Sequence, residues 1–133
     1  MNALLSAVRR PAVAAMLVLV AVALAVPTLA AGKAGRITVI SPKPGSTVSG
    51  SAVVLKLKAT GFRVTDQATK IRPNEGHFHV FLDKRPFVAV YGTTFRFRSL
   101  KAGSHTLKIQ PVNSAHMPAK GYKTIVVKFK TTG

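Results

Sequence analysis

Residues 52–60 read Ala-Val-Val-Leu-Lys-Leu-Lys-Ala-Thr, and this stretch sets the expectation for the fold. Successive side chains of a β-strand point to opposite faces, so the alternation places Val53, Leu55 and Leu57 on one face and Lys56 and Lys58 on the other. The stretch therefore predicts a half-buried strand with a basic outer face.

The same two-residue period recurs in most of the chain after residue 36. It predicts further strands at residues 37–40, 77–83, 87–91, 94–99, 105–112 and 122–130. Residues 61–76 lack a clear period and are predicted to form a long loop with room for a short strand. About seven short antiparallel strands at this spacing predict an all-β, immunoglobulin-like sandwich of two sheets.

The N-terminal segment differs in composition from the rest. Arg9 and Arg10 precede an apolar run over residues 11–26, and small residues follow Pro27 as far as Ala31. This order is typical of a cleavable signal peptide. We predict a hydrophobic signal helix within a signal peptide at 1–31, and a mature domain at 32–133 that is periplasmic, cell-surface or secreted. The alternative is an uncleaved membrane anchor, since the apolar run is long enough for a marginal span.

Charge is the most unusual property of the composition. The chain has 20 Lys and Arg against three acids, and removal of Arg9 and Arg10 leaves 18 basic residues and a formal charge of +15. Such a charge destabilises a compact domain by self-repulsion, which favours a function with an anionic partner. The chain has no cysteine, so the fold cannot depend on disulfides.

Basic side chains are predicted to project from both outer faces of the sandwich. If the strand at 94–99 pairs with the strand at 52–60, four of them share a face. The candidate polyanion-binding residues are Lys56, Lys58, Arg96 and Arg98 on one sheet and Lys108, Lys128 and Lys130 on the other. Lysines spaced by two along a strand bind polyanions without reading sequence. Few exposed aromatics accompany them, which argues against a specific nucleic-acid partner.

Three of the four histidines are candidate metal ligands. His77 and His79 are two residues apart on a predicted strand, so both point away from the core, and His116 follows the strand that should pair with theirs. Imidazole suits copper and zinc, and Glu75 or Met117 could add a donor. The structural alternative is that His77 and His79 hydrogen-bond the loops at that end of the sandwich.

The fourth histidine, His105, has the parity of the inward residues Leu107 and Ile109, two residues after Gly103. Sandwich domains often place a Tyr there whose hydroxyl bonds back to the preceding corner. A histidine ring nitrogen can make the same bond, so we expect a structural role. The three acids fall in a predicted loop, at a strand start and at a strand end, and no catalytic motif is present, so the chain is predicted not to be an enzyme.

Two motifs resemble those of known families. Gly76-His77-Phe78-His79-Val80-Phe81-Leu82-Asp83 resembles the GHxHxxxD strand of an uncharacterised family of secreted bacterial immunoglobulin-like domains. Residues 100–107 with 115–118 resemble the LxxGxHTL…HxP ending of that family, and the resemblance covers most of residues 36–129. A weaker resemblance, in residues 113–118, is to the periplasmic copper-resistance C proteins. Among the ligands of their copper-binding loop, only the histidine has a counterpart here, His116.

Together these patterns predict an exported, basic β-sandwich that acts as a binding or structural module of the cell envelope. Its expected partners are anionic polymers or surfaces, and no cofactor is required. The alternative is an exported protein that binds copper or zinc through His77, His79 and His116. The sequence leaves the oligomeric state open.

Overall fold

The computed structural model describes residues 35–66 and 70–133, and within them the chain forms nine β-strands and no helix. The predicted signal helix and the signal peptide at 1–31 lie outside these residues. None of the described residues forms a helix that is long and apolar enough to cross a membrane. The strands are β1 (Arg36–Ser41), β2 (Thr47–Val48), β3 (Val53–Thr60), β4 (Arg63–Val64), β5 (Glu75–Leu82), β6 (Val88–Val90), β7 (Thr94–Phe97), β8 (Gly103–Asn113) and β9 (Ile125–Thr131).

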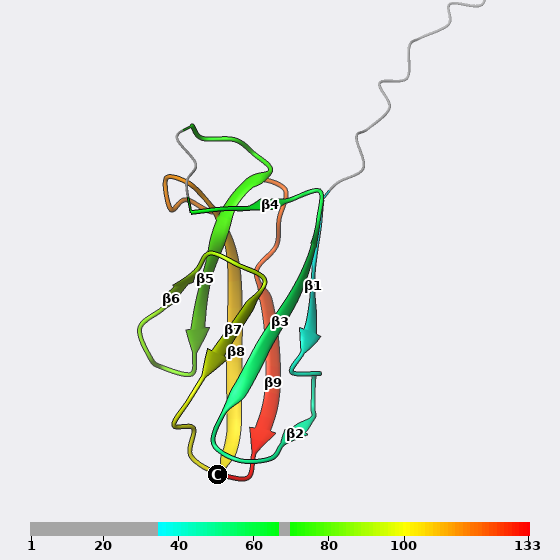
Figure 1. Cartoon of the computed structure of the whole chain (residues 1–133), viewed down its shortest axis with the longest axis vertical. Coiled ribbons are helices and arrows are strands. Elements are labelled where there is room, and N and C mark those ends of the chain that lie inside the picture. The colour runs from blue at the N-terminus through cyan, green and yellow to red at the C-terminus, as the bar shows by residue number, and fades with distance from the viewer. Residues whose placement is uncertain (1–34, 67–69) are drawn as a thin grey trace, which may run out of the picture. The chain divides into compact units, whose positions relative to one another are not determined.

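The strands form two sheets, as expected (Figure 1). The smaller sheet has the order β1-β3-β7, and the larger has the order β2-β9-β8-β5-β4, with β6 also paired to β5. Pairing is mostly antiparallel, but β2 runs parallel to β9 and β4 runs parallel to β5. Strand β4 lies in the stretch 61–76, where a short strand was allowed for, whereas β2 was not predicted. Each has only two residues, too few for an alternating pattern to appear.

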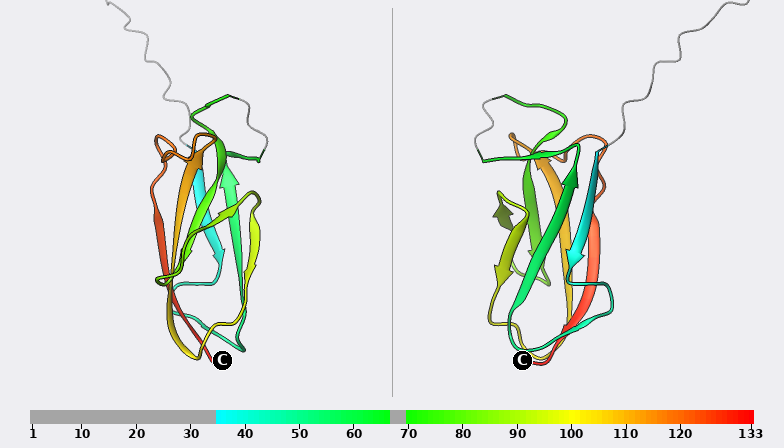
Figure 2. Two further views of the ribbon diagram at one scale, coloured as in Figure 1. Left: turned by 90° about the vertical axis from the view of Figure 1, so that its left-hand side faces the viewer. Right: turned by 45° about the vertical axis from the view of Figure 1, so that its right-hand side comes forward.

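The core lies between the sheets, and both contribute to it (Figure 2). Val53, Leu55 and Leu57 of β3 are buried as the alternation predicted. The larger sheet contributes buried apolar side chains at every second position of its long strands: Phe78, Val80 and Leu82 of β5, Leu107 and Ile109 of β8, and Val127 and Phe129 of β9. Burial of these side chains is the main force that holds the two sheets together.

Strand β5 differs from the other long strands because both of its faces are largely buried. His77 and His79 point away from the core, as their parity predicted, yet their exposures are only 3% and 8%. The cover on this face comes from side chains next to β6 and from the loop after β8. The fold thus builds a second, smaller buried environment around two histidines.

Candidate metal centre

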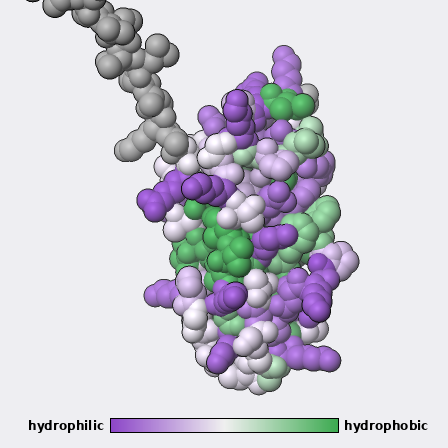
Figure 3. Space-filling view, turned by 180° about the vertical axis from the view of Figure 1, so that it is seen from behind, coloured by the Kyte–Doolittle hydropathy of each residue, from purple (hydrophilic) through white to green (hydrophobic). Residues whose placement is uncertain are grey.

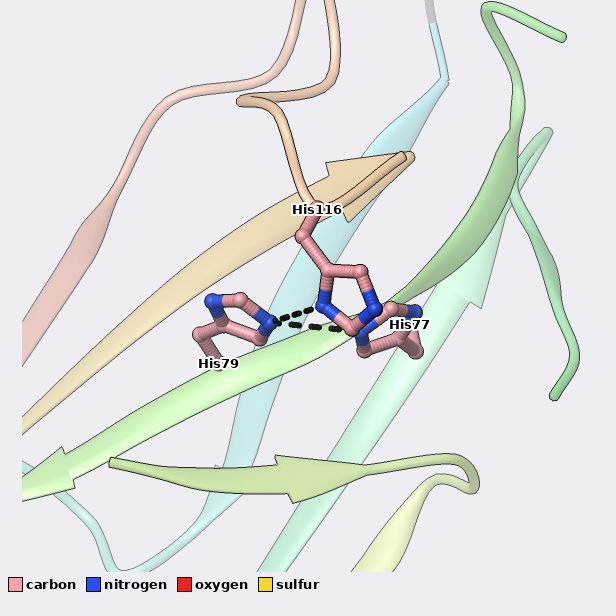
Figure 4. Close-up of side chains that lie close together, drawn as sticks. All are labelled: His77, His79 and His116. Atoms are coloured by element: carbon pink, nitrogen blue, oxygen red, sulfur yellow. Dashed lines mark hydrogen bonds between the residues drawn. The ribbon is translucent and has the colours of Figure 1, made fainter. Parts of the chain in front are cut away.

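Three imidazole rings converge at the end of the larger sheet where β5 begins and β8 ends (Figure 4). His79 Nε2 lies 3.3 Å from His77 Nε2 and 3.0 Å from His116 Nδ1. One nitrogen from each of the three rings lies within 4.8 Å of the other two. The structure thus brings together the three histidines that the sequence singled out.

The pairing of β5 with β8 accounts for this convergence. Gly76 pairs with Asn113 and His77 with Val112, so the first residues of β5 lie beside the last residues of β8. The chain leaves β8 at Asn113 and reaches His116 three residues later. His116 is therefore close to His77 in space although 39 positions separate them in the sequence.

The loop that carries His116 is organised by Asn113. The Asn113 side-chain oxygen accepts hydrogen bonds from the backbone N–H groups of Ala115 and Met117, at 3.0 and 3.1 Å. The backbone N–H of Asn113 donates to the Met117 carbonyl at 2.8 Å, which closes the loop. His116 has φ of 59°, a left-handed conformation that is uncommon for a residue other than glycine. This tight turn directs the His116 ring back toward β5.

Two aromatic rings next to β6 position the strand histidines. Ala89 pairs with His79, so its neighbours at two residues on either side, Phe87 and Tyr91, share the face of the histidines. The Phe87 ring stacks on His79 with centroids 4.1 Å apart, and the Tyr91 ring lies 4.6 Å from His77. These contacts restrict both imidazoles, while Ala89 is too small to cover them.

The strand histidines are held in the neutral form. Burial, followed by the charges of His116 and His79, lowers the pKa of His77 to about 4. Burial and then the charge of His116 also lower the pKa of His79. A neutral imidazole has a free lone pair, which is the form that binds a metal ion.

The distances fit a shared metal ion as well as a hydrogen-bonded cluster. Nitrogens bound to one zinc ion at about 2.0–2.1 Å in tetrahedral geometry lie about 3.4 Å apart. The separations of His79 from His77 and from His116, 3.3 and 3.0 Å, are close to this value, and the three nitrogens all lie within 4.8 Å of one another. In a cluster of neutral rings, His79 Nε2 carries either one N–H or one lone pair, so it can form one well-aligned hydrogen bond but not two.

The additional donors considered from the sequence are not part of the cluster. Glu75 is on the same face of β5, but its carboxylate forms an ion pair with Arg72 at 3.7 Å. Met117 is 60% exposed. A cavity of about 70 Å³ instead adjoins the cluster, with His77 and His116 on one side and Thr65, Asp66, Tyr91 and Ser114 as its other lining residues. A small molecule or water in this cavity would lie beside His77 and His116.

His105 lies at the opposite end of β8 and has a different environment. Its Nδ1 contacts Asp83 Oδ2 at 2.7 Å, and its Nε2 contacts the Lys101 carbonyl at 2.8 Å. The predicted bond to the preceding corner is therefore confirmed. Burial alone lowers the pKa of His105, but its bonds to Asp83 and Lys101, with the Asp83 charge, raise it overall above the ordinary value.

Asp83, His105 and Thr131 resemble a catalytic triad in residue type, with Thr131 Oγ1 3.0 Å from His105 Nε2. The hydrogen bonds argue against that role. Nδ1 faces the Asp83 carboxylate and Nε2 faces the Lys101 carbonyl, so the surroundings favour the doubly protonated ring, which has no lone pair to act as a base. Thr131 is 4% exposed, and its hydroxyl donates to the Lys101 carbonyl at 2.7 Å. The arrangement ties together the strand ends at this corner.

The candidate polyanion-binding residues occupy both outer faces. β3 pairs with β7, as expected, which places Arg96 opposite Val54 and near Lys56. On the larger sheet Lys128 pairs with Thr106 and Lys130 with Ser104. All seven are exposed: Lys56, Lys58, Arg96, Arg98, Lys108, Lys128 and Lys130. Among them, Lys108 lies over the Phe81 ring, 4.2 Å from its centroid.

Sequence reasoning missed the residues that support the histidines. Phe87 and Tyr91 fall in the predicted strand at 87–91 and have the same parity, but the sequence indicates no role for them. No role for Asn113 is apparent from the sequence either. What the sequence does not show is that β6 pairs with β5, and this pairing alone brings the two aromatic rings to the histidines.

Comparison with known proteins gives no match: no protein-family model, no curated protein and no solved structure is significantly similar to this chain.

Proposed function

We propose that this domain binds one copper(II) or zinc ion through His77, His79 and His116. The observation that carries the proposal is that a nitrogen from each ring lies within 4.8 Å of the other two. Two of the rings are buried, His79 stacked on Phe87 and His77 in contact with Tyr91, so their positions are fixed before any ion arrives.

The donor set favours these two metals. Three neutral imidazoles without a thiolate suit copper(II) and zinc, and copper(II) binds most tightly to a given nitrogen site among the divalent first-row ions. Three protein ligands leave a position open, which would face the cavity beside His77 and His116. The large positive charge of the domain opposes binding of a cation, and Asp66, which lines the cavity, partly offsets it.

The strand order supports an immunoglobulin-like sandwich. A three-stranded sheet faces a larger sheet in which β9, β8 and β5 are neighbours, and the β1–β2 segment contributes a strand to each sheet. We also propose that the domain is exported, because residues 9–31 have the composition of a signal peptide. A compact sandwich without cysteine would present the histidines in an oxidising compartment without disulfide chemistry.

Isothermal titration with copper(II) and zinc tests the metal proposal. We expect one ion per chain, and we expect His116→Ala to weaken binding more than 10-fold, since loss of a supporting contact alone typically costs about 10–100-fold. Met117→Ala is the matched control, because Met117 is the exposed neighbour of His116 and its replacement should leave the affinity unchanged. Absence of metal uptake by the wild-type domain at tens of micromolar would show that the histidines are structural.

A second candidate function is binding of anionic polymers. It is favoured by the small number of acidic side chains that are available to neutralise the basic ones. Glu75 is paired with Arg72, and Asp83 is bonded to His105. Within residues 35–66 and 70–133, Arg72–Glu75 is the one ion pair between a Lys or Arg and a carboxylate. The exposed basic side chains on both sheets are therefore left without internal counter-charges, and hydrophilic side chains project from much of the side of the molecule drawn in Figure 3.

A further inference from the structure

A hollow lies on the larger sheet at the end of β8 and β9 that is farthest from the metal centre. It has a volume of about 400 Å³, and its lining includes Ser104 and Thr106 of β8, Lys128 and Lys130 of β9, and Gly45. The backbone N–H of Gly45 donates to the Lys128 carbonyl at 2.8 Å, so the turn before β2 forms one border of the hollow. We call this feature the β8–β9 hollow.

The strand register arranges four polar side chains around it. Ser104 pairs with Lys130, and Thr106 pairs with Lys128. All four therefore project from the same face as two adjacent cross-strand pairs, with the two lysines about 7 Å apart along β9. Two ammonium groups and two hydroxyl groups can thus reach a common point above the sheet.

These four side chains are free to bind a ligand. None of them has a side-chain hydrogen bond or an ion pair to another described residue. Asp83 approaches the backbone of Thr106, but its carboxylate is occupied by the Thr106 N–H at 2.8 Å and by His105. Asp83 does not line the β8–β9 hollow. The group that fits is therefore an anion with several acceptor oxygens.

We propose that the β8–β9 hollow binds a phosphate or sulfate group of an anionic polymer. The proposal rests on the second function above and gives it a defined site. A tetrahedral oxyanion offers enough acceptor oxygens for two ammonium and two hydroxyl donors, and a lysine ammonium is a common phosphate ligand in proteins. A carboxylate has two oxygens in one plane, so it presents fewer acceptor oxygens, in fewer directions, than a tetrahedral oxyanion does.

The smaller sheet provides a stringent comparison. Lys56 and Lys58 have the same two-residue spacing on β3, and Arg96 and Arg98 lie nearby, so charge alone favours that face. If binding depended only on net charge, loss of Lys56 and Lys58 would weaken it at least as much as loss of Lys128 and Lys130. A defined site predicts the opposite order.

The experiment measures the affinity of the mature domain for inorganic polyphosphate, for a sulfated glycan and for polygalacturonate, a carboxylate polymer. The variants are Lys128→Gln/Lys130→Gln and the matched control Lys56→Gln/Lys58→Gln. A third variant, Ser104→Ala/Thr106→Val, removes the hydroxyls without changing the charge. Thermal melts of each variant verify that the fold is intact.

We expect the Lys128/Lys130 variant to lose about 10-fold or more in affinity for polyphosphate or the sulfated glycan, and the control to lose less than about 3-fold. If the Lys128/Lys130 variant loses more affinity for polyphosphate, the group bound is phosphate. If it loses more affinity for the sulfated glycan, the group bound is sulfate. The hydroxyl variant should also bind more weakly, and polygalacturonate should bind weakest.

Equal losses in the two lysine variants would overturn the defined site and leave general polyanion binding in place. A wild-type domain that binds none of the three polymers at low salt would overturn the second function as well.

Discussion

At the scale of single residues, neighbouring groups decide the chemistry of each histidine. His105 faces the Asp83 carboxylate and the Lys101 carbonyl, which accept hydrogen bonds and so favour a protonated ring. His77 and His79 face other imidazoles in a buried setting, which favours neutral rings. Histidines on adjoining strands of one sheet therefore serve opposite purposes: His105 closes a corner, and the other two keep their lone pairs available.

We predict that His105→Ala destabilises the domain by about 1–3 kcal/mol. The replacement leaves the buried Thr131 hydroxyl and the Lys101 carbonyl with fewer partners and removes the bond to Asp83. Urea unfolding at pH 6 is the measurement. An unchanged midpoint would mean that the ring makes no net contribution to stability.

The pH dependence of that loss is a separate prediction of the same pair. The pKa of His105 is raised from 6.5, so its contribution is complete below pH 6.5 and is lost as the pH rises through the folded value. Despite burial, which raises it, the pKa of Asp83 is lowered from 3.8 by its bonds to His105 and the Thr106 N–H, so its contribution is lost at lower pH. The difference between wild type and His105→Ala should be largest between pH 3.8 and 6.5. Asp83→Asn should abolish most of this pH dependence of stability. The lowered pKa of His77 affects wild type and His105→Ala equally, so it cancels in the difference between them.

At the scale of elements, β5 is the strand on which the candidate metal centre depends. It pairs with β8 along seven residues, with β6 along three and with β4 at its start. Each partner adds something to the site: β8 leads to His116, β6 carries the aromatic rings beside it, and the segment after β4 brings Thr65 and Asp66 to the cavity. A change in the approach of β5 to β8 therefore affects every ligand.

We predict that Gly76→Ala destabilises the domain by about 1–3 kcal/mol and weakens metal binding, because cores tolerate added atoms poorly. A Cβ at Gly76 would overlap the Val112 carbonyl oxygen and lie 2.9 Å from Asn113 Cα, both on the backbone of β8. Gly92→Ala is the control, since nothing lies within 4 Å of its Cβ position. Denaturant unfolding and metal titration of both variants are the measurements. Equal behaviour of the two would show that β8 can move away without loss.

At the scale of the whole molecule, the candidate metal centre and the β8–β9 hollow lie far apart. The histidines lie at one end of the larger sheet and the β8–β9 hollow at the other, with the length of β8 between them. Basic side chains occupy both outer faces, whereas the acids are few and largely paired. A cation and an anionic polymer could therefore bind at the same time without competing for a site.

We predict that the chain acts in a form that begins near Ala31 or Gly32. Export would place the basic domain among anionic polymers and remove Arg9, Arg10 and the apolar run. N-terminal sequencing of protein recovered from outside the cytoplasm is the measurement. An intact Met1 on membrane-bound material would instead favour an anchor.

Local patterns account for much of the fold. The alternation in residues 53–57 and 107–109 predicted buried faces that the structure has, because strand side chains alternate regardless of what the strand packs against. The two-residue strands β2 and β4 were not predictable in this way. Their backbone hydrogen bonds are to β9 and β5, partners that are distant in the sequence, and two residues carry no period.

The same distinction applies to the candidate site. The sequence by itself determined that His77 and His79 share a face, that His105 has the parity of the core, and that the chain is strongly basic, since these follow from spacing and composition. Only the tertiary structure decided that His116 reaches the other two, that Phe87 and Tyr91 hold them, and that two lysines border a hollow. Those features depend on the register between strands, and register is set by the packing of the whole core rather than by any one segment.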